Sequence, residues 1–302
     1  MTASAQARPL SSVILVGGPD SGKSNYIFRL WLAISNNEGG MFANGLPEHL
    51  EYLQNGCQSL LRGEFAQHTP ADVYSENVIP FSVATDEGAW KGEIVVPDCH
   101  GERWISIFKK REWTQEWEDR IAEPCGVLMF VRASSDQIQS PLDWIQCERM
   151  WCGLPPDEAS PKEFDVPTQV VMIDWLQFIA KAFSDRFGST RRPRLAMIVS
   201  AWDRVPEDRK VAGPTAYIAE EFPLLAQFLE SNRDLFDVGV FGVTIAGGDF
   251  KDEPGFKETS LAKENPLSGG YVVRDLGPAL AKRSDMTLPV AWALGIQPRT
   301  GG

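Results

Sequence analysis

The sequence contains few of the residues that build disulfide frameworks or zinc sites. Its 302 residues include three scattered histidines and five cysteines, and no two cysteines form a C-x-x-C pair. An odd number of cysteines without that spacing indicates neither a set of disulfides nor a zinc site, so we expect reduced thiols. The cysteines are Cys57, Cys99, Cys125, Cys147 and Cys152.

Long apolar segments are also missing. No apolar run reaches the roughly 18 residues of a membrane-spanning helix, and residues 1–8 lack the apolar centre of a signal peptide. Nothing therefore predicts membrane insertion or export. We expect a cytoplasmic protein without a membrane segment.

Positive charge is scarce. The chain has 29 Lys and Arg against 41 Asp and Glu, a formal net charge of −12, and only residues 109–111 and 191–194 are locally basic. Because nucleic-acid binding needs clustered Lys and Arg, we expect no nucleic-acid partner.

One glycine-rich stretch carries the strongest chemical signal. Residues 17–24 fit the phosphate-binding pattern G-x-x-x-x-G-K-[ST], and they follow a short apolar run, residues 12–16, and precede a helical pattern, residues 25–34. Strand, glycine loop and helix together make a cradle of backbone N–H groups for a polyphosphate. Lys23 would reach the β- and γ-phosphates, and the Ser24 hydroxyl would bind Mg²⁺. The predicted nucleotide-binding residues of this stretch are Gly17, Gly18, Pro19, Asp20, Ser21, Gly22, Lys23, Ser24 and Asn25.

The order of the other apolar segments predicts an α/β fold. Strands and helices alternate along the chain, which specifies a mostly parallel central sheet with helices on both faces. We expect one domain over residues 1–302, with its core at about 12–296 and insertions at about 38–75 and 135–165. The predicted strands are 12–16, 77–83, 90–96, 125–131, 195–199 and 238–244, with 77–83 and 90–96 forming a hairpin. The predicted helices are 25–34, 50–61, 113–121, 168–187, 216–229 and 288–294.

Two further segments end predicted strands at the edge where such sheets bind ligands. Residues 98–101, Asp-Cys-His-Gly, would place the Asp98 carboxylate beside the magnesium and the Gly101 N–H against the γ-phosphate. Residues 200–203, Ser-Ala-Trp-Asp, would place Asp203 where a carboxylate accepts from the N1 and N2 hydrogens of guanine. The alternative role for Asp203 is to cap the turn that follows.

These three segments occur in the order found in P-loop GTPases, and the sequence resembles the translation-factor and Ras-like (TRAFAC) class of that fold. It is most similar to bacterial double-GTPase-type domains, which are encoded in predicted conflict or defence operons. The resemblance runs from about Ser12 to Leu294. It implies a three-layer P-loop NTPase fold with an insertion after the first helix, Mg²⁺ and GTP or GDP as ligands, and Thr69 as the γ-phosphate and magnesium sensor.

The chain departs from this resemblance in two places. The usual guanine motif is [NT]KxD, but Ser200 and Ala201 replace its first two residues. The lost Lys stem normally covers the base, and Trp202 either stacks in its place or packs in the core. Glu102 occupies the slot of the water-positioning Gln, which predicts slow hydrolysis unless His100 orients water instead.

Three functions are compatible with the sequence. The first is a GTP/GDP switch with slow hydrolysis that signals to a protein effector or activating partner, with Lys23, His100, Gly101 and Glu102 as the catalytic residues. The second is an ATP-dependent enzyme or small-molecule kinase, which the weak base motif leaves open. The third is a nucleotide-locked interaction module, which Glu102 leaves open.

Overall fold

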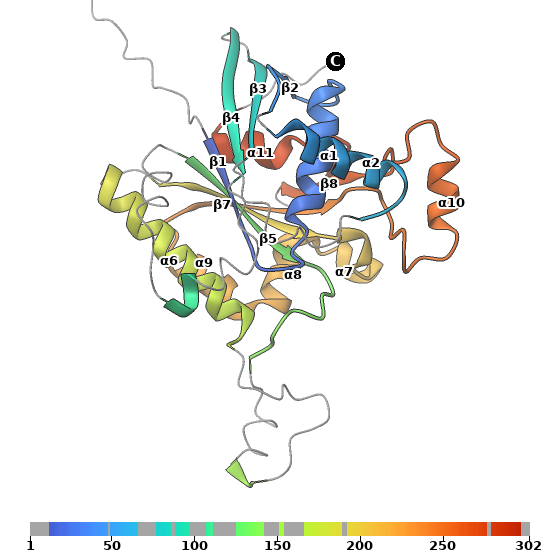
Figure 1. The fold of residues 1–302 in the computed structure, drawn as a ribbon. Helices are drawn as coiled ribbons and strands as arrows, with labels where there is room; N and C mark the ends of the chain where they lie inside the picture. Colours follow the sequence, from blue (N-terminus) through green and yellow to red (C-terminus); the bar gives the residue numbers. More distant parts are fainter. Residues whose placement is uncertain are drawn as a thin grey trace, which may run out of the picture.

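The computed structural model describes residues 12–47, 49–65, 77–85, 88–96, 107–110, 125–141, 151–153, 166–188, 192–276 and 279–296. Figure 1 shows the arrangement of the elements. The strands are β1 (Ser12–Val16), β2 (Met41–Ala43), β3 (Asn77–Thr85), β4 (Gly88–Val96), β5 (Cys125–Arg132), β6 (Arg194–Ser200), β7 (Asp237–Thr244), β8 (Tyr271–Leu276) and β9 (Ala279–Arg283). The helices are α1 (Lys23–Ser35), α2 (Leu50–Leu61), α6 (Thr168–Phe187), η1 (Trp202–Arg204), α7 (Glu207–Lys210), α8 (Gly213–Glu221), α9 (Pro223–Ser231), α10 (Phe256–Leu261) and α11 (Leu288–Leu294).

The central sheet has six strands in the order β1-β5-β6-β7-β8-β9. The first four are parallel, while β8 and β9 are antiparallel additions at one side. The parallel strands are nearly continuous apolar runs because both faces of the sheet are covered. This confirms the predicted α/β class and P-loop NTPase fold with a mostly parallel sheet.

Helices cover the sheet on two faces (Figure 1). Val13 and Leu15 of β1 point into one core, which is completed by α1 and α11. Ile14 and Val16 point into the other core, with α6, α8 and α9. Side chains that alternate along a strand face opposite sides of its sheet, so the two cores hold β1 from both sides.

The segment after α1 forms a smaller unit. Its strands pair as β2-β3-β4, and the predicted hairpin is confirmed and extended to Asn77–Thr85 and Gly88–Val96. Within it, α2 packs on α1 so closely that a Cβ at Gly56 would collide with the Phe28 ring. The end strand β4 contacts β1.

The structure differs from the predicted helices and strands in several places, and it also contains β2, α7 and α10, which were not predicted. The predicted helix 216–229 is two helices, α8 and α9, which meet at Phe222 with φ −128° and at Pro223. Proline lacks an N–H donor and fits the first turn of a helix, so it begins α9 rather than continuing α8. Strands β8 and β9 were not predicted, because charged residues interrupt both of them.

The predicted helix 113–121 lies outside the described residues. Within the described part of the chain, no helix has the length and apolar character needed to cross a membrane.

Candidate functional site

The loop between β1 and α1 lies close to two neighbouring strands of the sheet. A Cβ on Gly17 would come within 2.9 Å of the Phe130 carbonyl oxygen in β5, and a Cβ on Gly22 within 2.6 Å of the Ser200 Oγ at the end of β6. Gly22 also has a φ of 89°, which side chains rarely adopt. Glycine is therefore required at both positions, whereas a Cβ on Gly18 would meet open space.

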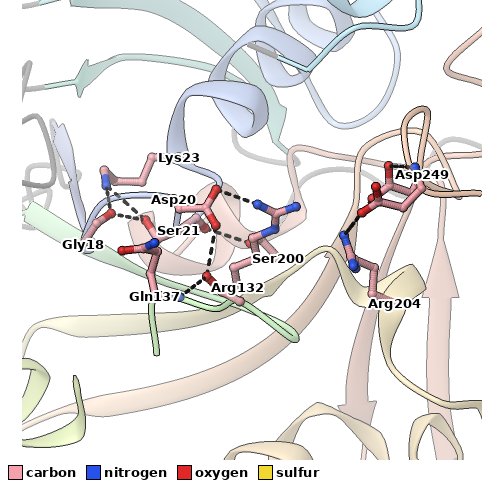
Figure 2. Close-up of polar contacts among 11 residues, drawn as sticks. Gly18, Asp20, Ser21, Lys23, Arg132, Gln137, Ser200, Arg204 and Asp249 are labelled. Carbon is pink, nitrogen blue, oxygen red and sulfur yellow. Dashed lines mark hydrogen bonds and ion pairs between the residues drawn. The ribbon is translucent and has the colours of Figure 1, made fainter. Parts of the chain in front are cut away.

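Helix α1 begins at Lys23 without a capping side chain and without an acidic residue in its first turn. Such a helix start presents backbone N–H groups and a positive partial charge. The Lys23 ammonium lies over the loop, where its Nζ donates to Gly17 O at 2.6 Å, Gly18 O at 2.8 Å and Ser21 Oγ at 3.0 Å (Figure 2). The loop, the helix start and Lys23 together favour a bound anion.

Ser200 connects the end of β6 to the loop. Its hydroxyl is buried and donates to the Ser21 carbonyl oxygen at 2.8 Å. The sequence marked Ser200 only as a departure from the guanine motif. The structure shows that this side chain fixes the loop against the sheet.

Asp20 of the loop forms a charged contact with Arg132 (Figure 2). Its carboxylate accepts from Arg132 at 2.6 Å and from the Ser135 hydroxyl at 3.0 Å. Arg132 is the last residue of β5, so it lies at the same edge of the sheet as the loop. Sequence reasoning assigned no arginine to this site, although an arginine that ends a central strand was a usable signal.

Asp203 lies in the short helix η1 that follows β6. It is half-buried, and among the described residues its carboxylate has no hydrogen-bond or ion-pair partner. Its backbone carbonyl accepts from Lys210 Nζ at 3.0 Å. Burial raises the pKa of Tyr271, and the charges of Asp203 and Glu207 raise it further. The Asp203 carboxylate thus lies within electrostatic range of Tyr271.

Arg204, next in the chain, is bound to carboxylates beyond β7. It contacts Asp249 at 3.0 Å and Asp252 at 2.9 Å (Figure 2). The ion pairs hold η1 against the loop that follows β7. The turn that carries Asp203 is therefore held in place by the ion pairs of its neighbour Arg204.

The family model of Double-GTPase 1 matches residues 14–293, which contain all of these contacts. The chain belongs to the Double-GTPase 1 family. Membership of this GTPase family supports a GTP-binding protein. A search of curated proteins gives no match.

Trp202 of this Double-GTPase 1 domain lies in the core. Its side chain is 1% exposed and meets Tyr217 edge to face, with ring centroids 5.8 Å apart. A Cβ on Gly242 would lie 2.5 Å from the indole, so the ring fills the space against β7. Of the two roles considered for Trp202, stacking on a base is corrected to core packing, because the ring has no exposed face to offer.

Other predicted residues of the Double-GTPase 1 site cannot be placed. Thr69, Asp98, His100, Gly101 and Glu102 lie outside the described residues. Pro19, Ser24 and Asn25 are described and lie in the loop or on the first turn of α1.

The described donor groups near the loop suit a magnesium ion that a nucleotide also holds. The described residues contain no group of three or more His, Cys, Asp or Glu side chains that could hold a metal. Ser24, half-buried beside the loop, offers a single hydroxyl oxygen. Mg²⁺ commonly takes one or two protein ligands and completes its shell with phosphate oxygens and water, so this donor set suits a nucleotide-bound ion.

Proposed function

We propose that this Double-GTPase 1 protein is a magnesium-dependent GTP/GDP switch with slow intrinsic hydrolysis that signals to a protein partner. The observation that carries the proposal is the Lys23 ammonium, held over a glycine loop that Ser200 ties to β6. That the protein acts in a bacterial conflict or defence system is argued from the resemblance alone.

Phosphate binding would use groups that are already oriented. The start of α1 supplies N–H donors, and Lys23 exchanges its contacts with Gly17 and Gly18 for contacts with phosphate oxygens. Ser24 would bind the Mg²⁺, which supplies positive charge to the β- and γ-phosphates. Asp98 remains a proposed magnesium residue, since it follows β4, which ends at Val96 and contacts β1. Thr69 remains one on the resemblance alone.

Base recognition would depend on Asp203 without help from stacking. A carboxylate accepts from both the N1 and N2 hydrogens of guanine, whereas adenine offers no such pair of donors at that edge. The burial of Trp202 leaves the base plane without an aromatic cover from this motif. That observation keeps the ATP-dependent enzyme as a second candidate function.

The direct test is the nucleotide itself. Protein purified in magnesium buffer is denatured, and the released nucleotide is identified by chromatography; calorimetry then compares Mg-GDP with Mg-ADP. We expect GDP or GTP and a clear preference for guanine. Equal affinity for ADP and GDP would favour the ATP-dependent alternative.

We expect Asp203→Asn to weaken GDP binding by about 10- to 100-fold, because an unpaired buried polar group costs about 1–3 kcal/mol. The amide offers a donor in place of an acceptor, so affinity should move toward xanthine nucleotides. Calorimetry with GDP and XDP measures the exchange. Asp208→Asn, an exposed position on α7, is the matched control and should bind GDP like the wild type. Loss of GDP affinity without a gain for XDP would contradict base reading by Asp203.

For turnover, we expect slow single-turnover GTP hydrolysis that a cognate protein accelerates. A supplied arginine is worth a factor of about 10³–10⁵ in phosphoryl transfer. Glu102 occupies the water-positioning slot, and Arg132 is already paired with Asp20 at 2.6 Å. Single-turnover rates of GTP hydrolysis by Glu102→Gln, Glu102→Ala and Arg132→Gln measure how much Glu102 and Arg132 each contribute to turnover. Rapid wild-type turnover that collapses in both Glu102 variants would rule out the partner-dependent scheme.

A further inference from the structure

A cavity of about 900 Å³ lies at the edge of the sheet opposite the phosphate loop. It is bounded by the first residues of β6 and β7, Arg194 and Asp237, by α8 and α9, and by the end of the antiparallel strand β8. The phosphate loop and Asp203 follow the carboxyl ends of β1 and β6. The cavity therefore lies at the amino ends of the same parallel strands and is separate from the nucleotide site.

The lining of this cavity is rich in arginine, although the whole chain carries a net charge of −12. Three acidic residues also line it, and two of them have partners within the lining. Glu230 pairs with Arg233 at 3.1 Å, and the Asp275 carboxylate accepts from the Thr215 N–H at 2.9 Å in the first turn of α8. The third acid is Asp237 and the four arginines are Arg192, Arg194, Arg233 and Arg274.

Two of the arginines are held on the same indole ring. The guanidinium of Arg194 lies 5.6 Å from the Trp292 ring centroid and that of Arg274 lies 5.2 Å from it. Arg194 also donates to the Trp292 carbonyl oxygen at 3.2 Å, and Arg274 lies 5.2 Å from the Phe241 ring. These contacts orient both guanidiniums before any ligand arrives.

The two guanidiniums are incompletely neutralised. Arg194 is 3.5 Å from Asp237, while Arg274 forms no ion pair within the described part of the chain. Burial lowers the pKa of Arg274, the charge of Arg194 lowers it further, and Asp237 and Asp275 act in the opposite direction. The positive charge of Arg194 thus disfavours the charged form of Arg274, and a bound anion would offset this repulsion.

Apart from Thr215, the rest of the lining is apolar or glycine. Val238 and Val240 of β7 and Leu229 of α9 are half-buried and face the cavity, with the buried Ile218 of α8 behind them. A volume of this size falls within the range of small-molecule sites, which combine apolar walls with a few oriented polar groups.

We propose that this cavity binds a small amphipathic organic anion, with its oxyanion head at Arg194 and Arg274 and its apolar body against Val238, Val240 and Leu229. The head would accept from the guanidinium forks, which match carboxylates and phosphates. The apolar body would leave water for the aliphatic wall. The site is independent of the nucleotide function proposed above.

Calorimetry with octanoate tests the proposal, because a carboxylate does not compete for a polyphosphate loop. Sodium acetate supplies the head without the body, and octanol supplies the body without the charge. We expect octanoate to bind at least about tenfold more tightly than either, since each half of the site contributes. No octanoate binding, or acetate binding as tight as octanoate, would overturn the proposal.

Two variants probe the two halves of the cavity. Arg274→Gln should weaken octanoate binding by about tenfold or more, because a charge-assisted hydrogen bond is lost. Arg283→Gln, an exposed position on β9, is the matched control and should leave binding unchanged. Ala219→Phe changes an exposed residue of α8 that lines the cavity, and its ring should block octanoate without altering charge. Octanoate binding that survives in Ala219→Phe would overturn the assigned location.

GDP affinity is measured on the same variants. We expect GDP affinity to be unchanged in all three. A wild-type protein that binds octanoate but no guanine nucleotide would contradict the proposed switch and still support the anion site. The thermal midpoint of Arg274→Gln shows whether its packing on Phe241 and Trp292 also supports the fold.

Discussion

Lys23→Ala is expected to reduce Mg-GDP affinity by at least about a hundredfold while the protein stays folded. The ammonium makes charge-assisted contacts, each worth about 1.5–3 kcal/mol, and a phosphate chain would engage two or more of them. In the structure its partners include three loop atoms, Gly17 O, Gly18 O and Ser21 Oγ. Its loss should therefore affect phosphate binding far more than folding.

Calorimetry with Mg-GDP measures this effect, and a urea titration checks the free energy of unfolding. Lys181→Ala is the matched control, since this lysine is 74% exposed on α6 and pairs with Asp185 one helical turn away. A folded Lys23→Ala protein that still bound Mg-GDP tightly would remove the phosphate role of the loop.

Trp202→Ala is expected to lower the free energy of unfolding by about 3–5 kcal/mol, the usual cost of truncating a buried Trp. The indole fills the space between Gly242 and Tyr217, and the surrounding sheet cannot close over the vacated volume. Urea denaturation followed by circular dichroism measures the change. Trp202→Phe, which keeps an aromatic ring, should lose less.

Trp151→Ala provides the matched control for this truncation, because Trp151 is 93% exposed. It should change the free energy of unfolding by only a few tenths of a kcal/mol. If Trp202→Ala weakened GDP binding strongly without lowering stability, the ring would be a base contact after all, and its burial would have to be relieved in the nucleotide complex.

The sequence predicted the phosphate loop well because its signals are local. A glycine pattern, an apolar run before it and a helical pattern after it all lie within about two dozen residues, and the structure places β1 and α1 around them. The six-stranded sheet was partly predictable for the same reason, since buried parallel strands are continuous apolar runs. The antiparallel strands escaped prediction because Arg274, Asp275 and Lys282 break the alternation that marks a strand.

The contacts that brace the site could not be predicted because they join residues far apart in the chain. Ser200 binds Ser21 and Arg132 binds Asp20 only once β5 and β6 lie beside β1. When only the motif is considered, Ser200 indicates that the Asn or Thr of the guanine motif has been lost. In the fold, the Ser200 hydroxyl holds the phosphate loop in position through Ser21.

The last strand of the described sheet has a consequence for how copies of the protein meet. A sheet edge exposes unpaired N–H and C=O groups, which invite strand addition and aggregation. β9 is short and ends in Lys282 and Arg283, both exposed, and the Lys282 Nζ lies 3.7 Å from the Tyr271 ring centroid. Two such edges approaching each other would bring four cations together. Repulsion between these cations therefore disfavours pairing of the β9 edges of two copies of the protein.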